Sequence, residues 1–109
     1  MKISFASDHL KKVCLEQKTA VRELGSDSAR KLRGRYSDLL AHSCVQEVHA
    51  GRPHPLKGER TGQFAVDLAG GHRLVFKPTI TPPPVLADGS TDWSMVMEIT
   101  IVFIGDYHD

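Results

Sequence analysis

The sequence predicts an α+β domain in which an N-terminal strand and a helical hairpin pack on a curved, mainly antiparallel sheet of about four strands. Helix-spaced apolar residues fill positions 10 to 40, strand-like patterns fill positions 64 to 76 and 96 to 104, and no heptad series or internal repeat competes with this organisation. A chain of 109 residues is long enough for one compact domain and too short for two. We therefore expect a single domain over residues 1–109.

The N-terminal half reads as one short strand followed by two amphipathic helices. Residues 3–5 can form the strand, and Asp8 can cap a helix that stops at Gly25. The apolar positions of this first helix are Leu10, Val13, Cys14, Val21 and Leu24. Ser26 or Asp27 can cap the second helix, which carries the apolar stripe Ala29, Leu32, Tyr36, Leu39 and Leu40.

The C-terminal half reads as a hairpin, an excursion and a final strand. Phe64, Val66 and Leu68 alternate with smaller or polar residues before the turn 69–71, and residues 72–76 return. Prolines and the Asp88-Gly89-Ser90 turn make residues 77–94 an exposed excursion, whose end Trp93 can anchor. Residues 96–104 turn wholly apolar, which predicts a central strand whose second half is buried on both faces.

Charge is divided along the chain. Residues 1–42 carry nine Lys/Arg against five Asp/Glu, whereas residues 77–109 carry one against five, although the whole chain has a net charge of +1. A basic face can therefore meet nucleic acid on a nearly neutral protein. The second helix offers such a face with Arg30, Lys31, Arg33 and Arg35, which is equally typical of an ordinary solvated surface.

Other classes of protein are disfavoured. No apolar stretch approaches a membrane span, and the N-terminus turns polar too early for a signal peptide, so we expect a cytoplasmic protein with no membrane partner. Cys14 and Cys44 are too far apart for a CxxC element, and Cys14 reads as core packing. The six histidines show no ligand spacing, which predicts neither a metal nor another cofactor.

Two segments carry candidate chemistry. His54, Lys57 and Arg60 lie in a glycine-bounded loop before the hairpin, and Asp106, Tyr107 and His108 close the chain. A histidine can move protons at neutral pH, and cations can stabilise the charge that develops on a phosphate. These are the parts of a ribonuclease, although His54 packed beside Pro55 with solvated neighbours is the plainer alternative.

The sequence here resembles the RelE/HigB superfamily of bacterial toxins, and specifically its HigB-like "killer protein" branch. The resemblance rests on His54-Pro55-Leu56-Lys57-Gly58, on the strand pair from Gly62-Gln63-Phe64 to residues 71–76, and on Asp106-Tyr107-His108. It implies a RelE-like microbial ribonuclease fold and a ribosome-dependent endoribonuclease that cuts messenger RNA in the decoding site. It also implies a helix-turn-helix, HigA-like antitoxin as partner.

The resemblance assigns catalytic positions to His54, Arg73, Asp106, Tyr107 and His108. Chemistry narrows the roles: His54 or His108 would serve as base or acid, and Arg73 with Lys57 would stabilise the phosphate. Asp106 suits the orientation of a histidine, and Tyr107 could orient or stack on a base. Lys57 and Arg60, with Arg30 and Arg33 of the second helix, are the expected RNA contacts.

Two other classes of function remain open on the residues alone. One is a toxin of the same fold that binds a protein target such as DNA gyrase without cutting RNA, for which the terminal histidine should be dispensable. The other is a non-catalytic interaction domain that uses the basic helix face and the proline-rich excursion.

Overall fold

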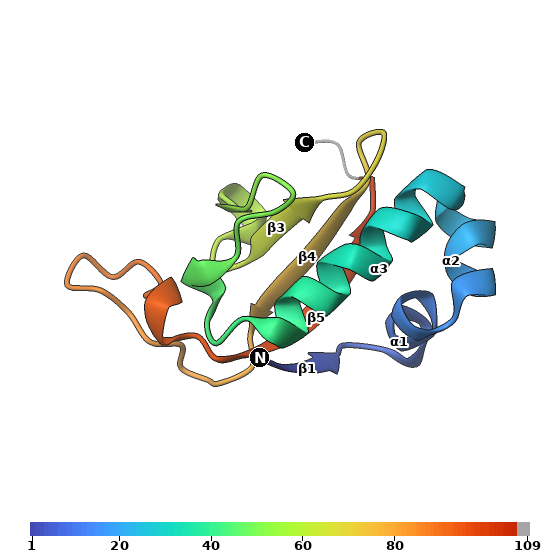
Figure 1. Cartoon of the computed structure of the whole chain (residues 1–109). Coiled ribbons are helices and arrows are strands. Elements are labelled where there is room, and N and C mark those ends of the chain that lie inside the picture. The colour runs from blue at the N-terminus through green and yellow to red at the C-terminus, as the bar shows by residue number, and fades with distance from the viewer. Residues whose placement is uncertain (107–109) are drawn as a thin grey trace.

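The computed structural model describes residues 1–106, which form a five-stranded sheet with the helices packed on one face (Figure 1). The strand order is β1-β5-β4-β3-β2. β1 (Lys2–Phe5) runs parallel to β5 (Glu98–Gly105), and β4 (Arg73–Pro78), β3 (Phe64–Asp67) and β2 (His54–Pro55) continue the sheet in antiparallel pairs. The predicted α+β class is confirmed, and the fifth strand is the two-residue β2.

Residues 1–106 contain three α-helices rather than the predicted two. α1 (Asp8–Leu15) and α2 (Gln17–Leu24) replace the single helix expected before Gly25, and α3 (Ser26–Ala41) follows. Glu16 separates the first two with extended dihedral angles, φ −115° and ψ 109°. Its N–H closes α1 on Lys12 O at 2.8 Å, and its carbonyl accepts from Ala20 N in α2 at 3.1 Å. The helical spacing continues across this break, so periodicity alone does not reveal it.

The helix stop predicted at Gly25 is confirmed, because Gly25 is the C-cap of α2, but the predicted N-caps were wrong. Ser7, one residue earlier than expected, caps α1 by accepting a hydrogen bond from Leu10 N at 3.2 Å. Gly25, with φ 84°, stands at the N-cap of α3, where no side chain forms the capping bond. Glycine is favoured here because the left-handed region costs it little.

The core lies between α3 and the sheet. Its fully buried side chains include Leu32 and Leu39 of α3, facing Leu74, Phe76, Ile99 and Ile101 of the two longest strands. Two residues of the predicted apolar stripes are outside it, because Val21 is 39% and Leu40 50% exposed. Both residues fit the helical spacing, but they lie outside the part of the helix surface that packs in the core.

β5 is an interior strand between β1 and β4, although β4 occupies the middle position. The prediction that its second half is buried on both faces was wrong, because Val102, Phe103 and Ile104 are only partly buried. The helices cover one face of the sheet, so alternate side chains here point to the open face. The register shift between Val75 and Phe76 falls in the same region.

The excursion after Pro78 is built as expected but starts two residues later, because Lys77 and Pro78 still belong to β4. It projects from the end of the sheet opposite to the β3–β4 turn (Figure 1). Trp93, in a short 3₁₀ helix (Trp93–Met95), packs edge-on against Phe64 with ring centroids 4.9 Å apart. Within residues 1–106, no helix combines the length and apolarity needed to cross a bilayer.

Candidate functional site

The open face of the sheet carries two of the predicted site residues, His54 and Arg73, in two adjacent rows. Residues paired across antiparallel strands point to the same face, and so do residues two apart along a strand. One row runs through Asp67, Arg73 and Gly105, and the next through His54, Ala65, Val75 and Phe103. The register of the hairpin therefore places His54 and Arg73 on one surface.

Arg73 is fixed at two points of its guanidinium group. Its Nε lies 3.2 Å from Asp67 Oδ1 on the neighbouring strand, and its Nη1 donates to Gly71 O at 3.0 Å. Only 24% of the side chain is exposed. A planar, always charged group held in this way suits the stabilisation of a phosphate oxygen, because little reorganisation is needed when the charge develops.

A hydrogen bond of His54 defines which of its two ring nitrogens carries the hydrogen. His54 Nδ1 lies 2.8 Å from Arg52 O, and a carbonyl can only accept, so Nδ1 carries the hydrogen. The neutral ring then presents Nε2 as the atom that can take up a proton. His54 is partly exposed on β2, and its Cα lies about 12 Å from that of Arg73, two strand spacings across the sheet and two residues along it.

The basic loop leads from β2 to β3. Lys57 is exposed just before a 3₁₀ turn (Gly58–Arg60), and Arg60 folds back so that its guanidinium carbon lies 4.7 Å above the Phe103 ring. Arg60 Nη1 also donates to Gln63 Oε1 at 2.9 Å. Arg60 therefore belongs to the same open face as His54 and Arg73, while Lys57 stands at its edge.

Asp106 follows β5 and lies beside the β3–β4 turn. A methyl group added at Gly71 would come within 3.4 Å of Asp106 Oδ2, which places this carboxylate next to the turn that also accepts from Arg73. Asp106 and Arg73 thus share one end of the sheet. The predicted positions Tyr107 and His108 lie outside the described residues.

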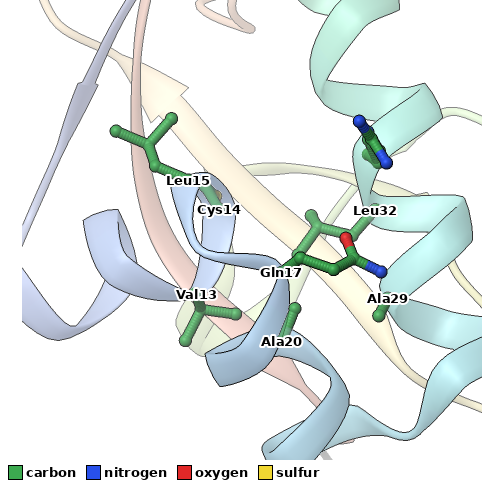
Figure 2. A pocket seen from close by; sticks show the side chains of 8 residues that line it. Val13, Cys14, Leu15, Gln17, Ala20, Ala29 and Leu32 are labelled. Carbon is green, nitrogen blue, oxygen red and sulfur yellow. The ribbon is translucent and has the colours of Figure 1, made fainter.

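Arg30 and Arg33 are not brought to this face. Arg30 is exposed on α3 and pairs with Asp27 at 3.5 Å, while Arg33 borders a hollow of about 120 Å³ between α1, α2 and α3. Figure 2 shows that hollow lined by Val13, Ala20, Ala29 and Leu32. Because α3 covers the core side of the sheet, these two arginines belong to a different surface from that of His54 and Arg73 (Figure 1).

The sequence reasoning missed two members of the site. Asp67 receives Arg73 on one carboxylate oxygen and Arg52 Nε, at 2.9 Å, on the other. Asp67 could have been found from the register, because a hairpin centred on Gly70 places it opposite Arg73. Nothing in the sequence marks Arg52, which reaches the site through an unusual backbone conformation with φ 49°.

A metal centre is not suggested by the side chains in the described part of the chain. No three histidine, cysteine or carboxylate side chains within residues 1–106 gather into a possible ligand group. What the open face offers instead is a histidine with a defined tautomer, several guanidinium groups and carboxylates that hold them. This is a surface suited to an anionic ligand with a phosphate backbone.

Fold and site together define a small α+β protein with a RelE-like toxin fold. A segment of 55 residues is 36% identical to "Toxin YoeB" of Streptomyces coelicolor, covering 50% of this chain and 66% of that protein, slightly less than two thirds of its length. No protein-family model matches the chain.

Solved structures agree over nearly the whole chain. The YoeB/ParE toxin from Agrobacterium tumefaciens superposes with a TM-score of 0.61 at 13% identity, covering 99% of this chain and 100% of that one. A YoeB-YefM complex and a YoeB dimer, both from Staphylococcus aureus, give TM-scores of 0.55 and 0.56 at 17% identity, each covering 100% of this chain and 98% of the other. In fold this chain is therefore similar to the YoeB and ParE toxins, while its membership of the RelE/HigB superfamily and its placement in the HigB-like branch stay predictions.

Proposed function

We propose that residues 1–109 form one toxin domain of a toxin-antitoxin system, and that this toxin is an endoribonuclease that cuts messenger RNA in the decoding site of the ribosome. The observation that carries the proposal is the shared open face, where His54 and Arg73 lie in adjacent rows and Arg60 stacks on Phe103 of the same face. The 36% identity to a YoeB toxin supports the same reading.

The proposed reaction needs only side chains and the RNA itself. A base removes the proton of a ribose 2'-hydroxyl, and the oxygen attacks the adjacent phosphorus to form a cyclic phosphate. The bond to the 5'-oxygen of the next nucleotide breaks, and an acid protonates that oxygen. Arg73 would stabilise the extra negative charge on the phosphate, aided by Lys57 and Arg60 at the edge of the face.

His54 and His108 are the two candidates for base and acid. The hydrogen bond from His54 Nδ1 to Arg52 O favours proton uptake at Nε2, which suits a base. His108, which we propose as the partner in proton transfer, follows Asp106 and Tyr107 along the chain. Asp106 would fix the orientation of a histidine, and Tyr107 would stack on or orient a base of the RNA.

The proposed partners follow from the same reading. The Staphylococcus aureus match is a complex of YoeB with YefM, which supports an antitoxin partner for this chain. We propose a helix-turn-helix, HigA-like antitoxin, action in the cytoplasm and binding to the ribosome.

Primer extension on a defined messenger RNA tests the proposal. Purified protein is incubated with translating ribosomes, and His54→Ala, Arg73→Gln and a chain ending at Asp106 are compared with wild type. We expect discrete ribosome-dependent cuts from wild type and a loss of about 100-fold to 10,000-fold when a proton-transfer group is removed. Wild-type cleavage that survives in both the His54→Ala and the truncated chains would refute the site.

A second candidate function is binding to a protein target such as DNA gyrase without RNA cleavage. It is favoured by the excursion and the segment that joins it to β5, which together expose five large apolar side chains: Ile80, Val85, Leu86, Met95 and Met97. Exposed apolar side chains gathered in one segment are typical of protein contacts. Growth arrest that persists in a His54→Ala, His108→Ala double variant, with no cuts by wild type, would favour this function over the nuclease.

A further inference from the structure

Asp67 is the point at which α3, β4 and the loop before β2 meet. Its N–H donates to Gly51 O at 2.6 Å, and its carbonyl accepts from Arg35 Nε of α3 at 3.1 Å. Its carboxylate contacts Arg52 Nε at 2.9 Å and Arg73 Nε at 3.2 Å. One residue on β3 therefore ties together α3, β4 and the loop that leads into β2.

The two arginines on the carboxylate arrive by different routes. Arg73 is placed by strand register, because it is the direct cross-strand partner of Asp67. Arg52 is placed by the loop, where Gly51 has φ 83° and Arg52 itself has φ 49°. A non-glycine residue in the left-handed region is sparsely populated and persists only when its surroundings determine it. The contacts with Asp67 are the surroundings that hold this conformation.

The position of Arg52 connects it to the proposed chemistry. Its carbonyl accepts from His54 Nδ1, and its guanidinium stands beside the carboxylate that also contacts Arg73. The Arg52 side chain is 68% exposed, whereas that of Arg73 is 24% exposed. Arg52 is thus on the solvent side of the pair, where an RNA strand would first meet it.

The local charge favours an anion. The carboxylate of Asp67 contacts two guanidinium groups, those of Arg52 and Arg73, so this cluster of three side chains carries a net charge of +1. Asp67 Oδ1 is buried, yet its contact with Arg73 is not aligned as a hydrogen bond. A phosphate presents the same kind of acceptor oxygens as a carboxylate, with geometry that matches the guanidinium fork. The arginines can therefore exchange part of their contact with Asp67 for a phosphate.

We propose that Arg52 is a second phosphate-binding residue of this site, held beside Arg73 by Asp67, which acts as an internal counter-ion for both arginines until RNA binds. The proposal rests on the proposed function in one respect, that the ligand is single-stranded RNA. Asp67 is a positioning residue, because it acts on the RNA through the two arginines.

Binding is measured first, so that cleavage plays no part. The probe is a fluorescein-labelled single-stranded oligoribonucleotide with 2'-O-methyl groups, which lacks the attacking hydroxyl, and its anisotropy is followed over a series of salt concentrations. Arg52→Gln should weaken binding and lower the slope of log affinity against log salt by about 0.7, the loss of one phosphate contact on a single strand. Arg22→Gln, which removes one exposed cation from α2, is the matched control and should keep the wild-type slope.

Asp67→Asn separates positioning from simple attraction. Removing the internal counter-ion should tighten binding of the probe at low salt by more than about 2-fold, because both arginines gain net charge for the phosphate. In the ribosome assay the same variant should lower the turnover rate by about 10-fold or more, because Arg73 loses its fixed orientation. A structural role alone would lower the melting temperature and leave the affinity of the folded protein unchanged. Asp8→Asn is the matched carboxylate control.

The outcomes separate this proposal from the nuclease assignment. If wild type cuts nothing but Arg52→Gln still lowers affinity and salt slope, the phosphate-binding role stands and the nuclease fails. If wild type cuts messenger RNA while Arg52→Gln binds the probe as Arg22→Gln does, the phosphate-binding role is overturned. Unchanged or weaker probe binding by folded Asp67→Asn would overturn the counter-ion role of Asp67.

Discussion

Ser28 Oγ and His72 Nδ1 lie 2.8 Å apart and join the first turn of α3 to the β3–β4 turn. Ser28 Oγ accepts from Ala69 N at 3.2 Å and donates to Ala69 O at 3.0 Å. Because the hydroxyl has one hydrogen, the third contact requires His72 Nδ1 to be the donor. The hydroxyl of Ser28 therefore donates one hydrogen bond and accepts two, which satisfies this buried polar group between α3 and the β3–β4 turn.

We expect Ser28→Ala to lower the free energy of unfolding by about 1–3 kcal/mol, because it leaves buried polar groups of the turn without their partner. Urea denaturation followed by circular dichroism measures this. Ser26→Ala, an exposed serine in the same turn of the helix, is the matched control and should stay within about 0.5 kcal/mol of wild type. Equal losses for the two variants would mean that the hydrogen bonds of Ser28 contribute nothing net.

The β-rich half was predictable because its signals are local. Alternation through Phe64, Val66 and Leu68 and the glycines at 70 and 71 fixed the hairpin, and the structure confirms β3 and β4 on either side of that turn. The break at Glu16 was not predictable, since no glycine or proline marks it and both halves keep helical spacing. There, packing of two short helices against α3 overrides the local pattern.

The candidate site also has a part that could be predicted from the sequence and a part that could not. Sequence motifs identified Arg73 and His54, and their common face follows from strand register. Arg52 depends on a left-handed backbone conformation that no local preference indicates, and its contact with Asp67 spans 15 positions. His72 received no role from the sequence, because its bond to Ser28 joins residues 44 positions apart. Such contacts exist only once the helix and the hairpin are packed.

Two glycine substitutions should have opposite effects. A methyl group at Gly51 would lie 2.5 Å from Arg35 Nε and 3.0 Å from Asp67 O, at a φ of 83° that alanine rarely adopts. Gly34 lies inside α3 with nothing within 4 Å of an added methyl group. We expect Gly51→Ala to destabilise the fold by more than about 1 kcal/mol. Gly34→Ala should stabilise it by about 0.5–1 kcal/mol.

Thermal or urea unfolding of the two alanine variants in parallel checks this pair. The comparison has a second readout, since Gly51→Ala disturbs the loop that carries Arg52 while Gly34→Ala leaves it untouched. Loss of ribosome-dependent cleavage should therefore accompany Gly51→Ala only. Two variants of similar stability would contradict the close approach of Arg35 and Asp67 to Gly51.

The excursion should depend on one aromatic anchor. Trp93 packs against Phe64, which in turn stacks on Phe76 with centroids 5.5 Å apart, so the end of the excursion joins the core through Trp93. We expect Trp93→Ala to cost about 3 kcal/mol, at the low end for truncation of a large aromatic, because Trp93 is only partly buried. Trp93→Phe keeps an aromatic contact and should cost clearly less.

Chemical denaturation measures both variants. Because Trp93 is the single tryptophan of the chain, its fluorescence in wild type also reports directly on this contact. If the excursion is anchored as described, the fluorescence transition and the circular dichroism transition should coincide in urea. A fluorescence change well before the loss of secondary structure would show that the excursion detaches on its own.

Cys14 should make the protein sensitive to high pH. Burial raises the pKa of the Cys14 thiol from 9.0 to about 12, and burial, followed by the charge of Cys14, raises the pKa of Tyr36 as well. Between pH 9 and 12 the unfolded thiol has lost a proton that the folded thiol retains, so the free energy of unfolding must fall as pH rises. The contribution is fully present below pH 9. Its slope is at most about 1.4 kcal/mol per pH unit.

Urea denaturation of wild type and Cys14→Ala at pH 7, 9 and 10 isolates this effect. The variant removes both the thiol and the electrostatic effect of its thiolate on the pKa of Tyr36. Cys14→Ala should be the less stable protein at pH 7, where it has lost packing next to Val13, and the difference should shrink at pH 10. The lysines titrate in both proteins and cancel in the comparison. A difference that stays constant from pH 7 to pH 10 would mean that the folded thiol ionises as readily as the unfolded one, and Cys14 would then lie in water rather than among the helices.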